Sequence, residues 1–471
     1  MAAMNKQESL RRFEELTPQQ IVDRLSDYIV GQTEAKRAVA VAIRNRLRRL
    51  QVSEELRDEI IPKNLILMGP TGVGKTEIAR RMAILLKAPF VKVEATKFTE
   101  VGYVGRDVDS IIRELTENSV RMLRQERIDE ISDTIAGKVV ERLVDYIQPL
   151  PGRPAASDDP EEAARRRQQH EEALEQVKRL RDKLRQRIRG GEMDDEKVTI
   201  EARENGNNMM QVFSAQGMEE MGMDLQNLFS SMTDKGKKKK RTTVGEARRI
   251  LMQEEADRLI DNDAIVREAI ERVELAGIVF IDEIDKIAHR EGGSSSGPDV
   301  SREGVQRDIL PLVEGTTVIT KYGPVRTQHI LFIAAGAFHV SRVSDLIPEF
   351  QGRFPLRVEL ESLTEEDFGR ILREPKNSLI RQYSQLLATD GVELQFSGGA
   401  ISRMAAIASK ANAESQNIGA RRLHTVMEKL LEDIAFEAPY DTPRRIRIDK
   451  AFIEEKLGGL LKEKDVAQYI L

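Results

Sequence analysis

The stretch from Gly69 to Thr76, Gly-Pro-Thr-Gly-Val-Gly-Lys-Thr, carries residue types that bind a chain of phosphates. It matches the pattern G-x-x-x-x-G-K-[ST] at every fixed position. Glycines let the backbone curl until several N–H groups point at one phosphate, and the start of a following helix adds partial positive charge. Lys75 can then reach the β- and γ-phosphates, and the Thr76 hydroxyl can bind Mg²⁺. The stretch predicts a site for a nucleoside triphosphate with Mg²⁺.

Two adjacent carboxylates, Asp282 and Glu283, end a second informative stretch. The apolar run Ile278-Val-Phe-Ile before them predicts a fully buried strand. In an open α/β sheet, ligands bind at the carboxyl edge of the strands. Asp282 would hold Mg²⁺ through its water shell, and Glu283 would orient and activate the attacking water. Two acids at a strand end can also cap a helix. Beside a phosphate loop, however, the pair favours hydrolysis as well as binding.

The segments around these residues predict the strand–loop–helix unit that the chemistry requires. The apolar run Leu65–Met68 precedes the loop, and residues 77–86 follow it with helical periodicity. Further buried strands are predicted downstream, at 90–95, 278–282, 329–335 and 356–360. These segments predict an α/β protein with a parallel five-stranded sheet.

Composition limits the classes of protein. The chain has 471 residues, which suffice for two to four domains. Charged residues make up 32% of it and its net charge is −5, so the chain as a whole is no electrostatic nucleic-acid binder. Cysteine is absent, which excludes disulfides, cysteine zinc sites and thiol nucleophiles. Residues 1–15 are polar and mixed in charge, unlike a signal peptide, and no apolar run approaches the ~20 residues that span a bilayer. We expect a cytoplasmic protein without a membrane or nucleic-acid partner.

The sequence changes character from about residue 112 to 244, where it becomes highly charged and helical. Residues 161–189 form a charged helix whose thin apolar stripe predicts a coiled-coil-like arm. Residues 209–232 hold six of the fifteen methionines, which suits either adaptable partner contacts or a flexible core stripe. The basic run 235–241 favours a solvated linker over a nucleic-acid patch. The region predicts an inserted domain.

From residue 364 the chain predicts a compact, largely helical domain. Helices are expected at 364–388, 398–413 and 419–437, and short strands near 392–396 and 445–448. Arg421 and Arg422 stand at the start of the third helix. The last six residues, 466–471, form an apolar tail, either a loose terminus or a docking peptide.

Two further stretches leave alternatives open. The apolar turn Tyr28–Gln32, upstream of the phosphate loop, suits an adenine ring or simple packing. Tyr103 stands between glycines, which suits an exposed, mobile loop tip or a tight turn with a packed ring.

Several motifs appear in a characteristic order. The phosphate loop is followed by Ile-Asp-Glu283, Ser-Arg-Glu-Gly-Val-Gln-Arg-Asp308, Leu-Ile-Pro-Glu-Phe-Gln-Gly-Arg353 and Gly-Ala-Arg421. Together they resemble the Clp/Hsp100 group of AAA+ ATPases, and within it the HslU (ClpY) family. The resemblance covers essentially the whole chain and is weakest in the insert. It implies a P-loop AAA+ ATPase domain at 1–111 and 245–362, an inserted, largely helical intermediate domain at 112–244, and a mainly helical C-terminal small domain at 363–471.

The resemblance also implies a function. It implies an ATP-dependent protein unfoldase and translocase, a homohexameric ring of the bacterial cytosol with Mg-ATP. Such a ring unfolds tagged or unfolded protein substrates and threads them into the HslV threonine peptidase. Catalysis would rest on Glu283, Lys75 and the arginine finger Arg353. Nucleotide contacts would come from Val30, Gly72, Val73, Gly74, Lys75, Thr76, Glu77, Asp282, Glu349 and the sensor arginine Arg421, with Mg²⁺ at Thr76 and Asp282. Gly102, Tyr103, Val104 and Gly105 would form the substrate-gripping pore loop, and Tyr469, Ile470 and Leu471 would dock on the peptidase.

Three rival interpretations remain. The ClpX family usually carries a four-cysteine zinc module, which this chain lacks, and the long insert favours HslU. A ring motor on DNA would need basic pore loops, whereas residues 102–105 offer an aromatic between glycines. A chaperone without a peptidase is disfavoured by the apolar tail. One departure stands out: many AAA+ proteins have Asn or Thr after the fourth strand to sense the γ-phosphate, but Ala334-Ala-Gly-Ala337 has no polar candidate.

Overall fold

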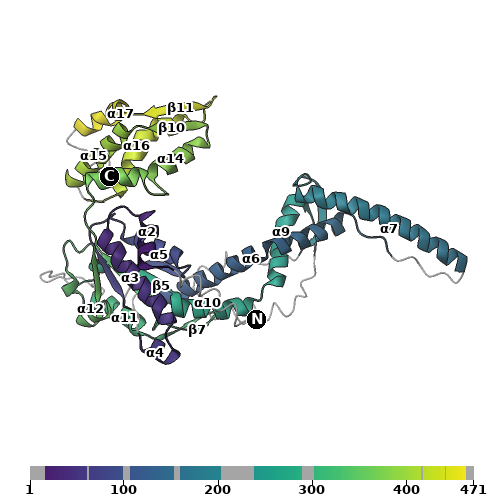
Figure 1. Cartoon of the computed structure of the whole chain (residues 1–471), viewed down its shortest axis with the longest axis horizontal. Helices are drawn as coiled ribbons and strands as arrows, with labels where there is room; N and C mark the ends of the chain where they lie inside the picture. Colours follow the sequence, from purple (N-terminus) through teal and green to yellow (C-terminus); the bar gives the residue numbers. More distant parts are fainter. Residues whose placement is uncertain are drawn as a thin grey trace. The chain divides into compact units, whose positions relative to one another are not determined.

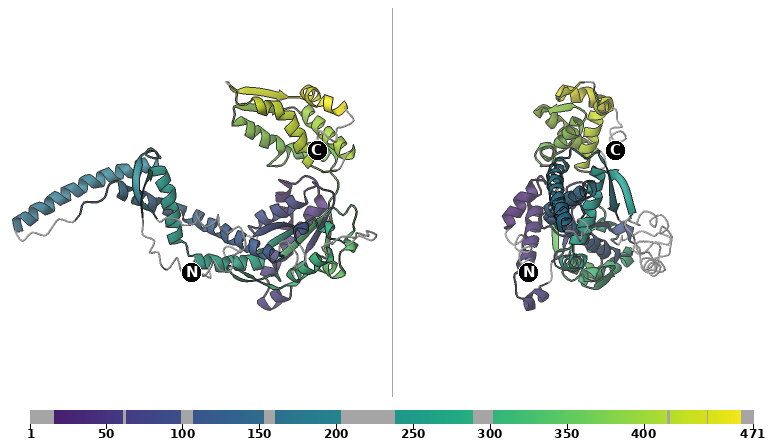
Figure 2. Two further views of the ribbon diagram at one scale, coloured as in Figure 1. Left: turned by 180° about the vertical axis from the view of Figure 1, so that it is seen from behind. Right: turned by 90° about the vertical axis from the view of Figure 1, so that its right-hand side faces the viewer.

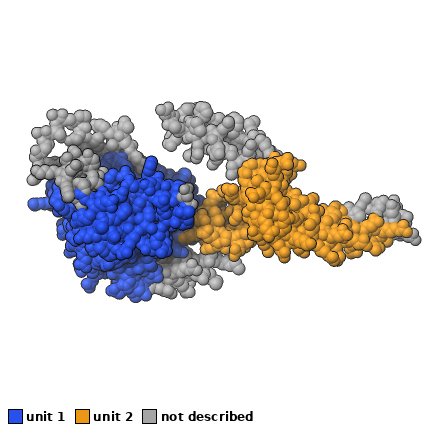
Figure 3. Space-filling model, turned by 90° about the horizontal axis from the view of Figure 1, so that it is seen from above, with its two compact units in different colours: residues 1–122, 266–471 blue, residues 123–265 orange. Residues whose placement is uncertain are grey.

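A computed structural model describes residues 16–60, 63–98, 107–152, 160–202, 238–288, 302–414, 417–440 and 442–462. The chain divides into two compact units, Met1–Met122 with Val266–Leu471, and Leu123–Ile265 (Figure 3). The domain boundaries expected from the sequence, near residues 112, 244 and 363, stay predictions.

A five-stranded sheet with the order β2-β5-β8-β1-β9 forms the centre of the first unit. Every neighbouring pair is parallel, which confirms the predicted α/β class. The strands are β1 (Leu65–Met68), β2 (Phe90–Glu94), β5 (Ile278–Asp282), β8 (Leu331–Gly336) and β9 (Leu356–Glu359). In the register, Met68 is opposite Gly336 and Glu94 is opposite Asp282. The ends of these four strands therefore meet at one edge.

Helices cover both faces of this sheet (Figure 1). Along β5, Phe280 belongs to one apolar cluster and Ile281 to the other, because successive side chains of a strand point to opposite faces. The first cluster includes side chains of α2 (Pro18–Ser26), α3 (Thr33–Leu50) and α5 (Lys75–Leu85). The second includes side chains from the start of α6 (Ser110–Ile147), from α10 (Asn262–Ala276) and from α11 (Arg302–Glu314) and α12 (Pro348–Arg353). Burial on both faces explains why the central strands are continuous apolar runs.

Local sequence signals explain the start of this unit's first described helix. Thr17 caps α2 through a capping box with Gln20, and Pro18 takes the first helical position. An antiparallel hairpin consists of β6 (Thr317–Thr320) and β7 (Gly323–Arg326). Short elements complete the frame: α4 (Glu54–Glu59), η1 (Ala95–Lys97), η3 (Ile284–Lys286) and η4 (Val343–Asp345).

The C-terminal part of the first unit has a core of its own. Its elements are α13 (Glu365–Arg373), α14 (Leu379–Ala388), β10 (Val392–Phe396), α15 (Gly398–Glu414), α16 (Arg421–Glu437), β11 (Arg444–Ile448) and α17 (Lys450–Lys462). The single helix expected at 364–388 is wrong, because it is interrupted between α13 and α14. Pro375 lies in that interruption, and proline lacks the N–H that a helix interior requires.

The second unit consists of the rest of α6 with α7 (Pro160–Arg189), β3 (Lys197–Ala202), β4 (Lys238–Thr243) and α9 (Val244–Leu259). Figure 2 shows α6 and α7 as long continuous helices. The linker expected at 235–241 is wrong in its second part, since residues 238–241 belong to β4, antiparallel to β3. The pairing sets Glu201 opposite Lys239, and opposite charges on facing residues stabilise such a pair. The methionine-rich stretch lies outside the described residues.

No helix in the described ranges is both long enough and apolar enough to span a membrane.

Candidate functional site

The phosphate loop joins β1 to α5, as the motif predicts. Gly69, Gly72 and Gly74 all have positive φ angles, of 138°, 76° and 104°. A Cβ atom on Gly69 would stand 2.5 Å from the carbonyl oxygen of Leu360, so this position has no room for a side chain. Val73 is buried, and Gly74 occupies the N-cap position of α5. The loop therefore presents backbone rather than side chains, which is the form that phosphate binding needs.

Lys75 lies folded along this loop. Its Nζ donates hydrogen bonds to the carbonyl oxygens of Gly69, at 2.5 Å, and Pro70, at 2.8 Å. Burial lowers the pKa of the Lys75 ammonium; Arg421 acts in the same direction, whereas Asp282 and Asp285 act against it. A triphosphate in the loop would add negative charge and favour the ammonium form.

The two predicted Mg²⁺ ligands converge. The Thr76 hydroxyl, at the start of α5, donates to Asp282 Oδ2, at the end of β5, over 3.4 Å. The same carboxylate oxygen pairs with Lys92 Nζ of β2 at 2.9 Å. A hydroxyl and a carboxylate side by side fit Mg²⁺, which takes one or two protein oxygens together with phosphate and water oxygens.

Glu283 follows directly, with a left-handed backbone at φ 58°. Few non-glycine residues adopt this conformation, which costs energy and often occurs at functional sites. Glu283 lies between strand β5 and η3, so this left-handed turn sets the direction of its side chain. Its Oε2 accepts a hydrogen bond from the Thr96 hydroxyl at 3.4 Å, just beyond the end of β2. The carboxylate is thus held at the same sheet edge as Thr76 and Asp282.

The turn that contains Val30 is held from two sides. Val30 is buried. The Gln32 side chain donates from Nε2 to the carbonyl of Glu361 and accepts at Oε1 from the backbone N–H of Glu361. Lys36 Nζ donates to the carbonyl of Ile29. Ile29 also approaches the loop, because its Cγ2 lies 4.0 Å from where a Cβ of Gly74 would be. The turn is hydrogen-bonded on both sides and adjoins the phosphate loop, as an adenine contact requires.

Arg421 begins α16 and is exposed. The backbone N–H of the preceding residue, Ala420, donates to the carbonyl of Gly72 at 3.0 Å. The structure therefore brings Arg421 to the phosphate loop, although the two are far apart in the sequence. Its electrostatic effect on Lys75 is consistent with this proximity.

Arg353 lies elsewhere. Its carbonyl accepts a hydrogen bond from the side chain of Asn64, which directly precedes β1. The phosphate loop leaves the other end of that strand, four residues and roughly 13 Å along. Arg353 is thus at the amino edge of the sheet, exposed, and its guanidinium pairs with Glu314 at 2.9 Å. Glu349, also exposed, stands in the first turn of the same helix.

Other candidates are placed as follows. Glu77 pairs with Arg81 within α5 at 2.7 Å. The pore-loop residues Gly102, Tyr103, Val104 and Gly105 lie outside the described residues, as do Tyr469, Ile470 and Leu471. Their roles stay predictions.

Three polar residues join the site that the sequence interpretation did not single out. Lys92 contacts Asp282, Thr96 contacts Glu283, and Asp285 acts on Lys75. Thr96 carried a usable signal, because it follows a predicted strand whose carboxyl end faces the ligand edge. Lys92 carried none, since the order of β2 and β5 in the sheet is a tertiary property.

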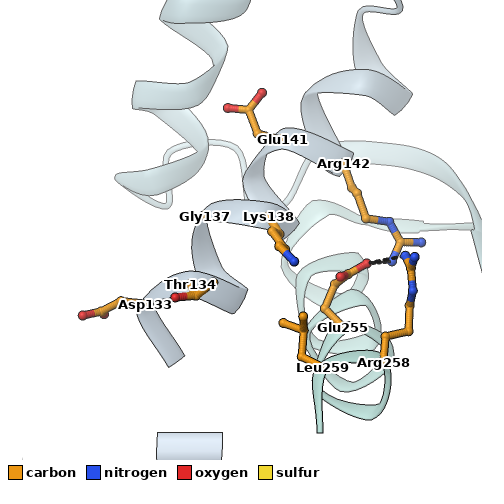
Figure 4. Close-up of a pocket in the computed structure, with 9 residues that line it drawn as sticks. All are labelled: Asp133, Thr134, Gly137, Lys138, Glu141, Arg142, Glu255, Arg258 and Leu259. Carbon is orange, nitrogen blue, oxygen red and sulfur yellow. Dashed lines mark hydrogen bonds and ion pairs between the residues drawn. The ribbon is translucent and has the colours of Figure 1, made fainter. Parts of the chain in front are cut away.

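The second unit contains a hollow of about 600 Å³, separate from the phosphate-loop site (Figure 4). It is lined by residues of α6 and α9, listed here in chain order: Asp133, Thr134, Gly137, Lys138, Glu141, Arg142, Glu255, Arg258 and Leu259. Glu255 is buried there and pairs with Arg142 at 2.8 Å. The hollow offers no glycine-rich loop or converging Mg²⁺ ligands, so it does not compete with the loop at Gly69–Thr76 as a nucleotide site.

Family models agree with this geometry. A model described as ATPase family associated with various cellular activities (AAA) matches residues 65–150. A model described as AAA domain (Cdc48 subfamily) matches residues 201–357. The first contains the phosphate loop, and the second contains Asp282 and Glu283.

Curated relatives match over nearly the whole chain. The ATP-dependent protease ATPase subunit ClpY of Bacillus subtilis is 52% identical over 465 residues, covering 97% of this chain and 99% of the relative. The ATP-dependent protease ATPase subunit HslU of Thermotoga maritima is 53% identical over 466 residues, covering 98% and 100%. The HslU subunit of Myxococcus xanthus is 55% identical over 458 residues, covering 97% and 99%.

Proposed function

The chain belongs to the HslU (ClpY) family of ATP-dependent protease ATPase subunits, and we propose that it is an ATP-driven protein unfoldase that feeds a threonine peptidase of the HslV type. The observation that carries the proposal is the convergence of Lys75, Thr76, Asp282 and Glu283 at one sheet edge. These groups supply the phosphate, Mg²⁺ and water contacts that hydrolysis of a nucleoside triphosphate needs within one subunit. Of the nucleotides, ATP is the one that the family uses.

Each residue has a physical task in this proposal. The loop N–H groups and Lys75 hold the phosphates, and Thr76 with Asp282 holds Mg²⁺, which neutralises phosphate charge when bound. Glu283, on its left-handed turn, orients a water and accepts its proton. Thr96 holds the Glu283 carboxylate in place until the water is bound. Val30 supports the adenine ring, and Arg421 contacts the phosphates from the side of α16.

A ring of identical subunits would give Arg353 a role. This arginine stands at the sheet edge opposite its own phosphate loop, so it can act as an arginine finger only on a neighbouring subunit's nucleotide. An arginine finger can contribute ~10³–10⁵ in rate. Hydrolysis would then depend on assembly, in a homohexamer as the family implies. Glu349, in the same exposed helix, belongs to that interface.

The remaining assignments complete the proposal. Tyr103 on its glycine-flanked loop grips unfolded or tagged polypeptides by shape rather than by sequence, and the tail Tyr469–Leu471 docks on the peptidase. The protein works in the bacterial cytosol, without a nucleic-acid or membrane partner. With the domain division at 112, 244 and 363, hydrolysis belongs to the ATPase domain, and the insert either recognises substrates or gates them.

The experiment that tests this function measures ATP hydrolysis with and without an HslV-type peptidase. Full-length protein is compared with a version that lacks the last eight residues, and a version with those residues in shuffled order is the control for length. We expect the peptidase to stimulate the full-length protein alone. Equal stimulation of all three versions would remove the docking role from the tail. No stimulation of any version would remove the peptidase partner and leave the ATPase.

A further inference from the structure

The turn that precedes α16 touches the phosphate loop backbone to backbone. A Cβ on Gly72 would stand 2.0 Å from the Ile418 carbonyl oxygen, and a Cβ on Gly419 would stand 2.5 Å from the Thr71 carbonyl oxygen. Both glycines have positive φ, at 76° and 61°. The Ala420 N–H donates to the Gly72 carbonyl at 3.0 Å. Arg421 is the next residue, so this contact determines where its side chain starts.

Asn412 of α15 holds this turn at two points. Its Oδ1 accepts a hydrogen bond from the backbone N–H of Ile418 at 3.2 Å. Its Nδ2 donates to the carbonyl of Gly419 at 3.1 Å. The residue is only 9% exposed. Water is therefore a poor substitute for Asn412 at either of these two groups.

Arg422 fixes the orientation of the Asn412 amide. Arg422 is completely buried, and its Nε donates to Asn412 Oδ1 at 3.4 Å. A guanidinium carries donors only, so the oxygen of the amide must face it. The NH₂ group then has to face the Gly419 carbonyl. The backbone N–H of Arg422 also donates to Gly419, at 3.1 Å. These contacts thus fix one orientation for the amide, which bonds the turn at both Ile418 and Gly419.

We propose that Asn412 is a positioning residue, whose amide clamps the 418–420 turn against the phosphate loop and thereby sets the position of Arg421 beside the nucleotide. This inference rests on the proposed function, because it needs Arg421 to contact phosphate. It adds that the sensor arginine is oriented by a buried amide one helix away. Without the clamp, the turn gains conformations and Arg421 is in its productive position for a smaller fraction of time.

Asn412→Asp is the sharpest probe. The carboxylate keeps an acceptor for Ile418 and for Arg422, with which it forms an ion pair, so we expect the domain to stay folded. The carboxylate has no N–H to donate to the Gly419 carbonyl, so the hydrogen bond from residue 412 to Gly419 is lost. We expect kcat for ATP hydrolysis to fall about tenfold, as for the loss of one positioning hydrogen bond, with a smaller change in KM. Asn377→Asp, the same chemical change at an exposed site between α13 and α14, is the control and should leave both constants unchanged.

A double-mutant cycle with Arg421→Ala distinguishes positioning from a structural role. We expect Arg421→Ala and Asn412→Asp,Arg421→Ala to have the same kcat, because the clamp acts only through Arg421. Multiplying effects would overturn the proposal, as would a normal kcat for Asn412→Asp while Arg421→Ala is slow. A normal kcat for Arg421→Ala would instead remove the role proposed for Arg421, and the clamp with it, but would leave the hydrolytic residues in place.

A second variant covers a failure of Asn412→Asp to fold, which thermal unfolding would detect. Gly419→Ala disturbs the turn from the opposite side, because its Cβ would collide with Thr71. We expect the same non-additivity with Arg421→Ala. A kcat for Gly419→Ala equal to that of the wild type would overturn the proposal.

Discussion

The two compact units have different frames: the first is built on a five-stranded parallel sheet and the second on long helices. The first unit contains three clusters of buried apolar side chains, two on the faces of the sheet and one in the C-terminal part. The second unit has buried apolar residues too, among them Leu143, Ile200 and Leu251. Its helices, however, are also joined by arginine–carboxylate pairs, with Arg142 connecting α6 to α9 and Arg185 connecting α7 to α6.

This difference indicates which unit is suited to catalysis. A sheet buried on both faces resists deformation, so groups at its edge keep their mutual distances, as catalysis requires. Partly exposed ion pairs hold long side chains only weakly and are screened by salt. The nucleotide chemistry accordingly resides on the sheet of the first unit, while the ion pairs between helices of the second unit can be tested one at a time.

The largest expected effect is on the rate of ATP hydrolysis, which should depend on a carboxylate of the first unit and not on one of the second. Glu283→Gln removes the base that accepts a proton from water, and we expect ATP hydrolysis to slow by ~10²–10⁴-fold with unchanged ATP affinity. Calorimetry and a steady-state ATPase assay measure both quantities. Glu255→Gln, the same change at a buried acid of the second unit, is the control and should hydrolyse ATP at nearly the normal rate. Slow hydrolysis by the Glu255→Gln control would mean that ATP hydrolysis also depends on the second unit.

The next effect is on the stability of the sheet. Phe280→Ala removes a fully buried ring from the centre of β5, and we expect a loss of ~3–5 kcal/mol in unfolding free energy. Denaturant titration followed by circular dichroism measures it. Phe436→Ala, at a ring that is 89% exposed, is the matched control and should change the stability by less than about 0.5 kcal/mol. Similar losses in the two variants would contradict the assignment of the sheet as the main source of stability.

A smaller effect is expected in the second unit. Arg142→Leu leaves Glu255 buried with only the longer pair to Arg258, at 3.3 Å. We expect a local loss of about 3 kcal/mol, since removing one partner leaves a buried charge poorly compensated. Hydrogen exchange at the amides of α9 measures it. Arg258→Leu, whose side chain is 71% exposed, should cost less than about 1 kcal/mol. Equal protection of α9 in the two variants would mean that α9 does not depend on the Arg142 pairs.

The smallest effect concerns Arg185, which pairs with both oxygens of Glu141 at 2.6 and 2.9 Å. We expect Arg185→Gln to cost less than about 1 kcal/mol, and less still at high salt. The hydrogen bond from Arg185 lowers the pKa of Glu141 below its usual 4.5. The folded protein therefore holds this proton less tightly than the unfolded chain, so the stabilisation is present above pH 4.5 and is lost as pH falls through the lowered pKa.

The pH dependence of unfolding tests this contribution of the Arg185–Glu141 pair. Acid unfolding of the wild type and of Arg185→Gln, followed by helical circular dichroism, should differ above about pH 4.5 and converge at lower pH. Arg179→Gln, at an exposed pair within α7, is the control for loss of charge. A difference that persists unchanged at low pH would assign the contribution of Arg185 to packing rather than to its charge.

The chemistry and its local supports could be predicted from the sequence. The loop at Gly69–Thr76 and the acids at 282–283 are short-range patterns, because each requires only a strand that ends at the right residue. The central strands β1, β5 and β8 were predictable, since burial on both faces leaves continuous apolar runs. Interruption of the helix at Pro375 also had a local signal, which the longer periodic pattern obscured.

Other features depend on residues that are distant in the sequence. The basic residues of β4 form a strand only because β3 is present as a partner, and Lys92 reaches Asp282 only because β2 and β5 are neighbours.

The phosphate loop, the carboxylate pair and the strands that present them are all encoded locally, because each depends on residue types at close spacing. Only the tertiary structure decided which groups meet. It put Arg421 at the phosphate loop through Ala420, held there by Asn412, and it put Arg353 at the opposite edge of the sheet. The physical reason is that strand order and the packing of α15 and α16 follow from burial summed over the whole chain, which no local pattern encodes.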